Sequence, residues 1–131
     1  MMATVFTKII QGIIPCYKVA EDSNFLAFLD ISPLQKGHVL IVPKVEVDYV
    51  FDLDDEILSK WLLFAKPIAA AMKKAFPCNR VSIHVIGLEV PNAHMHLLPI
   101  NRPEDVLFSN PKLKFTPEEY KEIAEKIAVN M

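Results

Sequence analysis

The stretch Pro91-Asn92-Ala93-His94-Met95-His96-Leu97-Leu98-Pro99 decides how the rest of this chain is interpreted. It holds two of the four histidines of the protein, two positions apart and between apolar residues. In a β-strand alternate side chains share one face, so Asn92, His94 and His96 are predicted to line one side of a strand. The two prolines bracket the run, as is typical of strand ends. Imidazole suits nucleophilic and proton-transfer chemistry near neutral pH, which makes this strand the candidate site.

Size and charge limit what kind of protein this is. The 131 residues suffice for one core, and we expect a single domain over residues 1–131. The formal charge is -2 and Lys and Arg do not form a run, so the sequence gives no sign of a basic surface that binds nucleic acid. No leader is recognisable, and no apolar run approaches the ~20 residues of a membrane span. A cytoplasmic protein is predicted, with Cys16 and Cys78 as reduced thiols and a disulfide or redox role as the alternatives.

Short apolar segments predict the strands of a sheet. Residues 16–20 and 25–29 have strand length and are separated by a turn of polar residues. Residues 38–42 form a β-branched strand, and the loop of about eight residues before it predicts an antiparallel neighbour. Residues 80–86 alternate as a strand. Because only a short loop follows them, this strand is expected to lie antiparallel beside the histidine strand.

Three segments have helical patterns. Residues 4–11 begin with a threonine that suits an N-cap. Residues 54–76 carry apolar side chains at three- and four-residue steps, and Pro67 is expected to kink or divide this helix. Residues 116–129 open with the signature of a capping box, whereas residues 101–115 are polar and predict a surface segment. The fold class predicted is α+β: an antiparallel sheet of about five strands with a long central helix and a C-terminal helix.

Several motifs resemble the histidine triad (HIT) superfamily. Its signature alternates three histidines with apolar residues, and here His94 and His96 stand at the second and third positions while Asn92 stands at the first. The other segments similar to this family are Val5 to Ile10, Phe28 to Pro33 and Gly37 to Lys44. The resemblance covers residues 3 to about 100, and it implies a HIT-like fold and a homodimer.

The resemblance also implies a chemistry for the histidines. In HIT enzymes the middle histidine, here His94, attacks the phosphorus bonded to a nucleoside 5′-oxygen, and water hydrolyses the covalent nucleotidyl-imidazole that forms. Neutral imidazole is a good nucleophile without prior deprotonation. His96 is expected to donate a hydrogen bond to a phosphoryl oxygen or to protonate the leaving group. His38 resembles a family histidine that sits beside the triad.

A nucleotide pocket is implied in the same way. Asp30 matches the acidic residue that accepts hydrogen bonds from the ribose hydroxyls, for which a carboxylate is an apt bidentate acceptor. Val5 and Thr7 stand where some members carry zinc-binding cysteines, so no zinc and no other cofactor is expected. His84 matches no family position and is expected to be structural. The residues at positions that form the apolar slot for the base are Phe6, Ile9, Phe28, Ile31 and Leu40.

Two positions depart from the family pattern. Asn92 replaces the first histidine, and an amide forms hydrogen bonds but does not titrate near neutral pH. Because the nucleophile is retained, we expect a slow enzyme rather than an inactive one. Leu88 follows Gly87 where the family often has a glutamine that reaches the substrate, which affects leaving-group contacts and substrate range.

Three hypotheses follow from these residues. The first is a nucleotide hydrolase or transferase that cleaves nucleoside phosphoramidates or dinucleoside polyphosphates, with a purine nucleotide as the expected substrate and no required metal. The second is a catalytically weakened nucleotide-binding or interaction protein on the same fold. The third is a metal site at His94 and His96 that His38 or His84 completes. No cysteine or carboxylate pattern in the sequence supports this third hypothesis.

Overall fold

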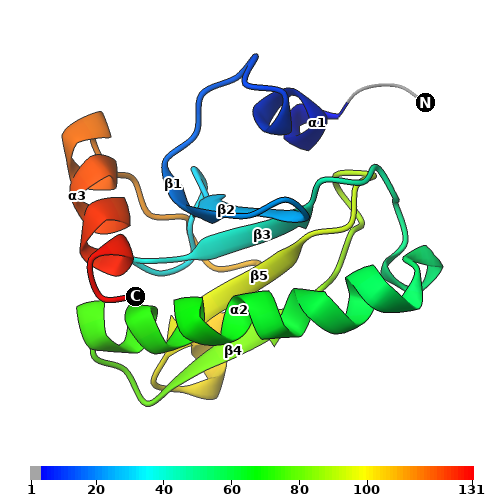
Figure 1. Ribbon diagram of the computed structural model, residues 1–131. Coiled ribbons are helices and arrows are strands. Elements are labelled where there is room, and N and C mark those ends of the chain that lie inside the picture. Colours follow the sequence, from blue (N-terminus) through cyan, green and yellow to red (C-terminus); the bar gives the residue numbers. More distant parts are fainter. Residues whose placement is uncertain (1–3) are drawn as a thin grey trace.

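The computed structural model describes residues 4–131, in which five strands form one sheet with helices on both of its faces (Figure 1). The strand order is β1-β2-β3-β5-β4, so β5 lies between β3 and the edge strand β4. All neighbouring pairs are antiparallel, including the two pairs that the loop lengths predicted. The predicted α+β class is therefore confirmed. The strands are β1 (Lys18–Glu21), β2 (Phe25–Leu29), β3 (Val39–Pro43), β4 (Arg80–His84) and β5 (Met95–Ile100).

Strand β2 shows why the sheet is covered on both sides. All five of its residues are buried, which is typical of a strand between two apolar layers. Phe25, Ala27 and Leu29 belong to the larger core under the long helix, whereas Leu26 and Phe28 belong to a smaller core on the opposite face. Because alternate side chains of a strand point to opposite faces, this single apolar strand contributes to both layers.

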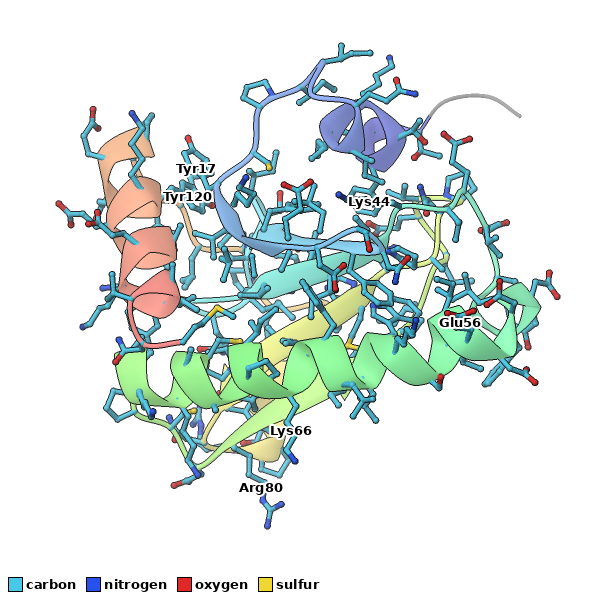
Figure 2. The ribbon with its side chains drawn as sticks, viewed as in Figure 1. Tyr17, Lys44, Glu56, Lys66, Arg80 and Tyr120 are labelled. Carbon is cyan, nitrogen blue, oxygen red and sulfur yellow. The ribbon has the colours of Figure 1, made fainter. Side chains whose placement is uncertain are left out.

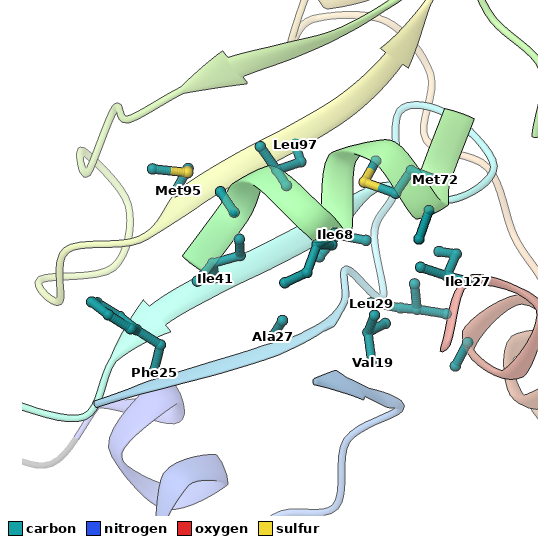
Figure 3. Packing of buried hydrophobic residues seen from close by; sticks show 14 of the residues in the cluster. Val19, Phe25, Ala27, Leu29, Ile41, Ile68, Met72, Met95, Leu97 and Ile127 are labelled. Atoms are coloured by element: carbon teal, nitrogen blue, oxygen red, sulfur yellow. The ribbon is translucent and has the colours of Figure 1, made fainter. Parts of the chain in front are cut away.

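The long helix α2 (Asp55–Ala75) covers one face of the sheet (Figure 1). The side chain of Asp54 caps its start by accepting the N–H of Ile57 at 2.8 Å. Pro67 lies inside one continuous helix, so of the two predicted outcomes, a kink or a division, the division is wrong. The helix continues because its buried stripe packs on the sheet on both sides of the proline. Figure 3 shows the end of this stripe, where Ile68 and Met72 lie beside side chains of the strands.

The two shorter helices lie on opposite faces (Figure 1). Helix α3 (Pro117–Ala128) starts with the predicted capping box and joins the core under α2. Its Tyr120 stacks on Tyr17 with ring centroids 4.8 Å apart, and the two rings are visible at the left of Figure 2. Helix α1 (Val5–Ile10) lies on the other face and is capped by Thr4, as predicted. Lys66 and Arg80 project outward below α2 in Figure 2.

The histidine strand begins later than predicted. Strand β5 starts at Met95, so Asn92 and His94 lie in the segment before it. There the N–H of Asn92 donates to the carbonyl of Val90 at 2.8 Å, and the N–H of Ala93 donates to the carbonyl of Val47 at 2.7 Å. One of these N–H groups is satisfied in a local turn and the other by a distant loop, not by a strand ladder, which is why the strand starts after them.

Alternation along this stretch otherwise follows the prediction. Ala93, Met95 and Leu97 pack in the core under α2. The other boundaries differ by a few residues: β3 begins after His38, and β4 ends at His84 rather than at residue 86. Two single turns of 3-10 helix, η1 (Val50–Asp52) and η2 (Pro103–Val106), complete the elements. Among residues 4–131 there is no helix with both the length and the apolar character needed to cross a bilayer.

Candidate active site

A cavity of about 430 Å³ opens on the sheet face that carries α1. This volume is in the range of small-molecule sites. Its wall joins the segment before β5 to the ends of β2 and β3 and to α1. The predicted site residues in the wall are Phe6, Ile9, Phe28, Asp30, Ile31, His38, Leu40, His94 and His96. Asn92 is the one predicted site residue outside the wall, and it is 1% exposed.

His94 is oriented by the backbone just before it. Its Nδ1 lies 2.8 Å from the carbonyl oxygen of Asn92. A carbonyl oxygen only accepts, so the proton of neutral His94 is on Nδ1 and the lone pair is on Nε2. Phe6 packs against the ring in an edge arrangement, with centroids 4.8 Å apart. This buried imidazole therefore has one anchored nitrogen and one nitrogen available for chemistry.

His96 has the opposite tautomer because of a chain of hydrogen bonds. The backbone N–H of Leu34 donates to His38 Nδ1 at 3.1 Å, so the proton of neutral His38 is on Nε2. That Nε2 lies 2.9 Å from His96 Nδ1, which must then accept. The proton of His96 is left on Nε2. The ring centroids of His94 and His96 are 5.0 Å apart, so a lone pair and an N–H are close together in one cavity.

Burial keeps the imidazoles of His38 and His96 neutral. It lowers the pKa of His38 from 6.5 to about 3, and the charge of Lys112 and protonation of His84 act in the same direction. Burial also lowers the pKa of His96 to about 3, aided by His38 and His94 and opposed by Asp30. Both groups are therefore neutral at physiological pH, which is the state that the hydrogen-bond chain requires.

Asp30 follows strand β2 at the edge of the cavity. Its Oδ1 accepts the N–H of Ser32 at 2.8 Å, which fixes the carboxylate. Its Oδ2 lies 3.5 Å from His38 Nε2, and the side chain is 17% exposed. The carboxylate therefore keeps acceptor capacity toward the cavity, as binding of two neighbouring hydroxyl groups requires.

The residues that come closest to forming a metal site are not the pair His94 and His96 that the sequence suggested. Within residues 4–131, ligand atoms of Asp30, His38 and His96 lie within 4.8 Å of one another. A carboxylate thus joins two histidines, although no carboxylate pattern in the sequence pointed to it. However, His38 Nδ1 already accepts the N–H of Leu34, so Nε2 keeps its proton and offers no lone pair to a cation. The geometry favours the hydrogen-bond chain over metal coordination.

Phe108 is a site residue that sequence reasoning missed. It lies in the predicted surface segment, but its ring lines the cavity with its centroid 4.9 Å from that of His96 and 6.4 Å from that of His38. The N–H of Leu113 donates to the carbonyl of Pro33 at 2.8 Å and ties this segment to the loop before His38. The only signal in the sequence was the short apolar run Val106-Leu107-Phe108 inside an otherwise polar segment.

The remaining wall residues are mostly apolar. Leu88, at the position where a glutamine was expected, is 89% exposed and lies at the rim with Gly87. Lys112 is the one lysine or arginine of the wall in the described part of the chain. His84 pairs with His96 across the sheet and lies outside the wall, with Nε2 bonded to Ser82 Oγ at 2.9 Å.

Known proteins resemble this chain in sequence and in structure. The family model for the HIT domain matches residues 11–102. An uncharacterized HIT-like protein of Borreliella burgdorferi is 33% identical over 139 residues, and the alignment covers 100% of both chains. Adenosine 5′-monophosphoramidase hnt1 of Schizosaccharomyces pombe is 33% identical over 97% of each chain. The crystal structure of a Hit-like protein from Bartonella henselae has a TM-score of 0.86 at 28% identity, covering 98% of this chain and 96% of that one. The chain therefore belongs to the HIT family.

Proposed function

We propose that this HIT protein is a nucleotide hydrolase or transferase in which His94 is the nucleophile. The observation that carries the proposal is the pair of opposite tautomers in one cavity. His94 offers the lone pair of Nε2, and His96 offers the proton of its own Nε2. Transfer of a phosphoryl group to nitrogen needs an electron pair for the attack and a hydrogen-bond donor for the charge that develops on the phosphoryl oxygens.

The proposed reaction has two steps. First, His94 Nε2 attacks phosphorus, a P–N bond forms, and the bond from phosphorus to the leaving group breaks. The N–H of His96 Nε2 donates a hydrogen bond to a phosphoryl oxygen, and the leaving group takes its proton from the solvent. The carbonyl of Asn92 stabilises the positive charge on the phosphorylated ring through the Nδ1–H bond. Second, water attacks phosphorus, the P–N bond breaks, and the proton of the water goes to the solvent. A nucleoside monophosphate is released and both imidazoles regain their starting tautomers.

The wall suits a nucleoside. In this proposal Asp30 accepts hydrogen bonds from the two ribose hydroxyls, and the apolar slot supplies nonpolar surface for a purine base. Phe6 and Phe28, whose ring centroids lie 5.9 Å apart, supply aromatic surface for the base. Ile9, Ile31 and Leu40 complete this slot.

Charge favours a substrate with a single phosphate. Lys112 is the one lysine or arginine of the wall among residues 4–131, and Asp30 and Glu89 lie in the same wall. A dinucleoside polyphosphate brings several negative charges into this site, whereas a nucleoside phosphoramidate brings one. The S. pombe relative is named for the second kind of substrate. We infer that nucleoside 5′-phosphoramidates are the better substrates of the two classes.

Asn92, which stands where the resemblance puts the first triad histidine, does not remove the nucleophile. Its side chain is outside the cavity wall, and His94 uses the backbone carbonyl at this position. Any residue supplies that carbonyl. We therefore infer that the protein is an enzyme, and that binding without turnover is the alternative outcome of the test below.

We also infer a homodimer of single-domain subunits. Strand β4 leaves one edge of the sheet unpaired within residues 4–131, and its Ile83 is 50% exposed. Leu62 and Leu63 on the outer side of α2 are 55% and 69% exposed. An open strand edge and exposed apolar side chains favour pairing with another chain. Light scattering after gel filtration measures the mass, and a monomer at micromolar concentration would contradict this inference.

Turnover tests the function. We expect the native chain to hydrolyse adenosine 5′-phosphoramidate faster than diadenosine triphosphate, and His94→Ala to lose activity. The matched control is His84→Ala, which removes a histidine outside the wall and is expected to retain the native rate. If the native chain binds adenosine monophosphate in calorimetry but turns over neither substrate, it is a binding protein rather than an enzyme.

A further inference from the structure

Asn92 links the segment that carries His94 to the first helix. Its amide Nδ2 donates to Thr4 Oγ1 at 3.3 Å, across 88 positions of sequence. The residue is 1% exposed and lies outside the cavity wall. Its side chain therefore acts on a neighbouring protein group and not on anything in the cavity.

Thr4 is the N-cap residue that fixes the start of α1. Its Oγ1 accepts the N–H of Thr7 at 3.1 Å and also lies 3.1 Å from Thr7 Oγ1. The helix has six residues, and helices this short are not stable by themselves in water. Its position depends on this cap and on the packing of Phe6 in the smaller core.

The position of α1 defines one side of the cavity. Val5, Phe6 and Ile9 all line the wall, and Phe6 packs against the ring of His94. We propose that Asn92 is a positioning residue: its amide anchors Thr4, so that α1 keeps Phe6 against His94 and holds the base slot in shape. This proposal rests on the proposed function of the cavity as a nucleotide site.

The two parts of Asn92 then have separate tasks. The backbone carbonyl orients His94, and that task survives any side-chain substitution. The amide holds the wall, so its removal is expected to weaken nucleotide binding and to leave the rate at saturation nearly unchanged. A side chain that took part in the chemistry itself would change kcat instead.

The experiment compares Asn92→Ala, Thr4→Val and the double variant with the native chain. Calorimetry gives the Kd of adenosine monophosphate, and hydrolysis of adenosine 5′-phosphoramidate gives kcat and KM. We expect Kd and KM to rise roughly threefold to tenfold in Asn92→Ala, as for the loss of one hydrogen bond. The rise in Thr4→Val is expected to be at least as large, because this change also removes the cap of α1. Because both changes break the same bond, the double variant is expected to match Thr4→Val rather than to add a further loss. We expect kcat to change by less than about twofold.

Two further variants separate this role from general destabilisation. Thr4→Ser keeps the hydroxyl group and is expected to retain native Kd. Thr116→Val removes the equivalent cap of α3, away from the cavity wall. It is expected to lower the melting temperature without changing Kd. A rise in Kd for Thr116→Val equal to that for Thr4→Val would overturn the proposal.

Hydrogen exchange gives a readout that needs no nucleotide. The amides of residues 5–10 are expected to exchange faster in Asn92→Ala and in Thr4→Val than in the native chain. If the native chain proves inactive, this result still decides whether Asn92 holds α1, so the two proposals fail separately. Unchanged exchange, or a fall in kcat with unchanged Kd in Asn92→Ala, would overturn the positioning role.

Discussion

His38 Nε2 lies 2.9 Å from His96 Nδ1, and this contact decides which nitrogen of His96 keeps a proton. The proton of neutral His38 is on Nε2 because its Nδ1 accepts the backbone N–H of Leu34. A backbone amide thus determines, through two imidazoles, that an N–H of His96 is presented to the cavity. On the other side of the site the carbonyl of Asn92 leaves His94 with a free Nε2.

The first prediction concerns His38 as the residue that orients His96. His38→Leu removes the donor, so His96 is free to adopt either tautomer. We expect kcat to fall about fivefold or more, corresponding to the loss of a hydrogen bond of about 1 kcal/mol. His38→Gln places an amide N–H near the former Nε2 and is expected to lose less. Single-turnover kinetics measures both, and equal rates for the leucine and glutamine variants would exclude the proposed donor role.

The second prediction concerns the dependence of stability on pH. Burial lowers the pKa of His38 and of His96 in the folded protein from 6.5 to about 3. Between these values the unfolded chain binds protons that the folded protein does not. The free energy of unfolding is therefore highest above pH 6.5 and falls as the pH decreases toward 3.

Urea unfolding at about pH 7 and about pH 4.5 measures this dependence. His38→Gln removes one of the two groups and is expected to lose less stability between the two pH values than the native chain. The same slope in both proteins would mean that His38 is not buried as a neutral group.

The third prediction concerns Phe108 as the cover of the imidazoles. Phe108→Ala admits water to His96 and His38, so the pKa of both is expected to rise toward 6.5. Titration of the imidazole resonances by NMR measures the change. Phe51→Ala is the control, since Phe51 is 71% exposed and lies outside the cavity wall. Unshifted titration in Phe108→Ala would show that the protein shields these rings by other means.

The fourth prediction concerns metal ions. Asp30, His38 and His96 are near one another, but coordination requires that His38 lose the Nε2 proton. We expect chelators to leave the hydrolysis rate unchanged and elemental analysis to find less than about one zinc per ten chains. Stoichiometric metal together with loss of activity after chelation would contradict this tautomer assignment.

Local features of the sequence predicted most of the fold. The alternation of side chains in the strands and the threonine N-caps of the helices depend only on residues close in sequence. The two N-caps are found where expected, at Thr4 and Thr116. Pro67 does not divide α2, because the apolar stripe of this helix packs on the sheet on both sides of the proline. In this helix tertiary packing outweighs a local signal.

The site was predictable only where a family motif marked it. The motif gave the histidines, Asp30 and the apolar slot, all of which line one cavity. It did not give the turn at Asn92, because that turn depends on distant partners, Val47 and Thr4. Nor did it give Phe108, whose segment is held by contacts with distant residues, such as the backbone bond between Leu113 and Pro33. Contacts of this kind leave no periodic pattern in a sequence.

The covalent intermediate on His94 is the most direct test of the central claim. The native chain and His94→Ala are mixed with adenosine 5′-phosphoramidate, stopped in alkali within one turnover because phosphorylated imidazole is labile in acid, and digested for mass spectrometry. We predict an adenylyl group on the peptide that carries His94 in the native chain, no such group in His94→Ala, and a loss of turnover of roughly 10⁴-fold or more. Native turnover by His94→Ala, or an adenylyl group on another residue, would contradict the account.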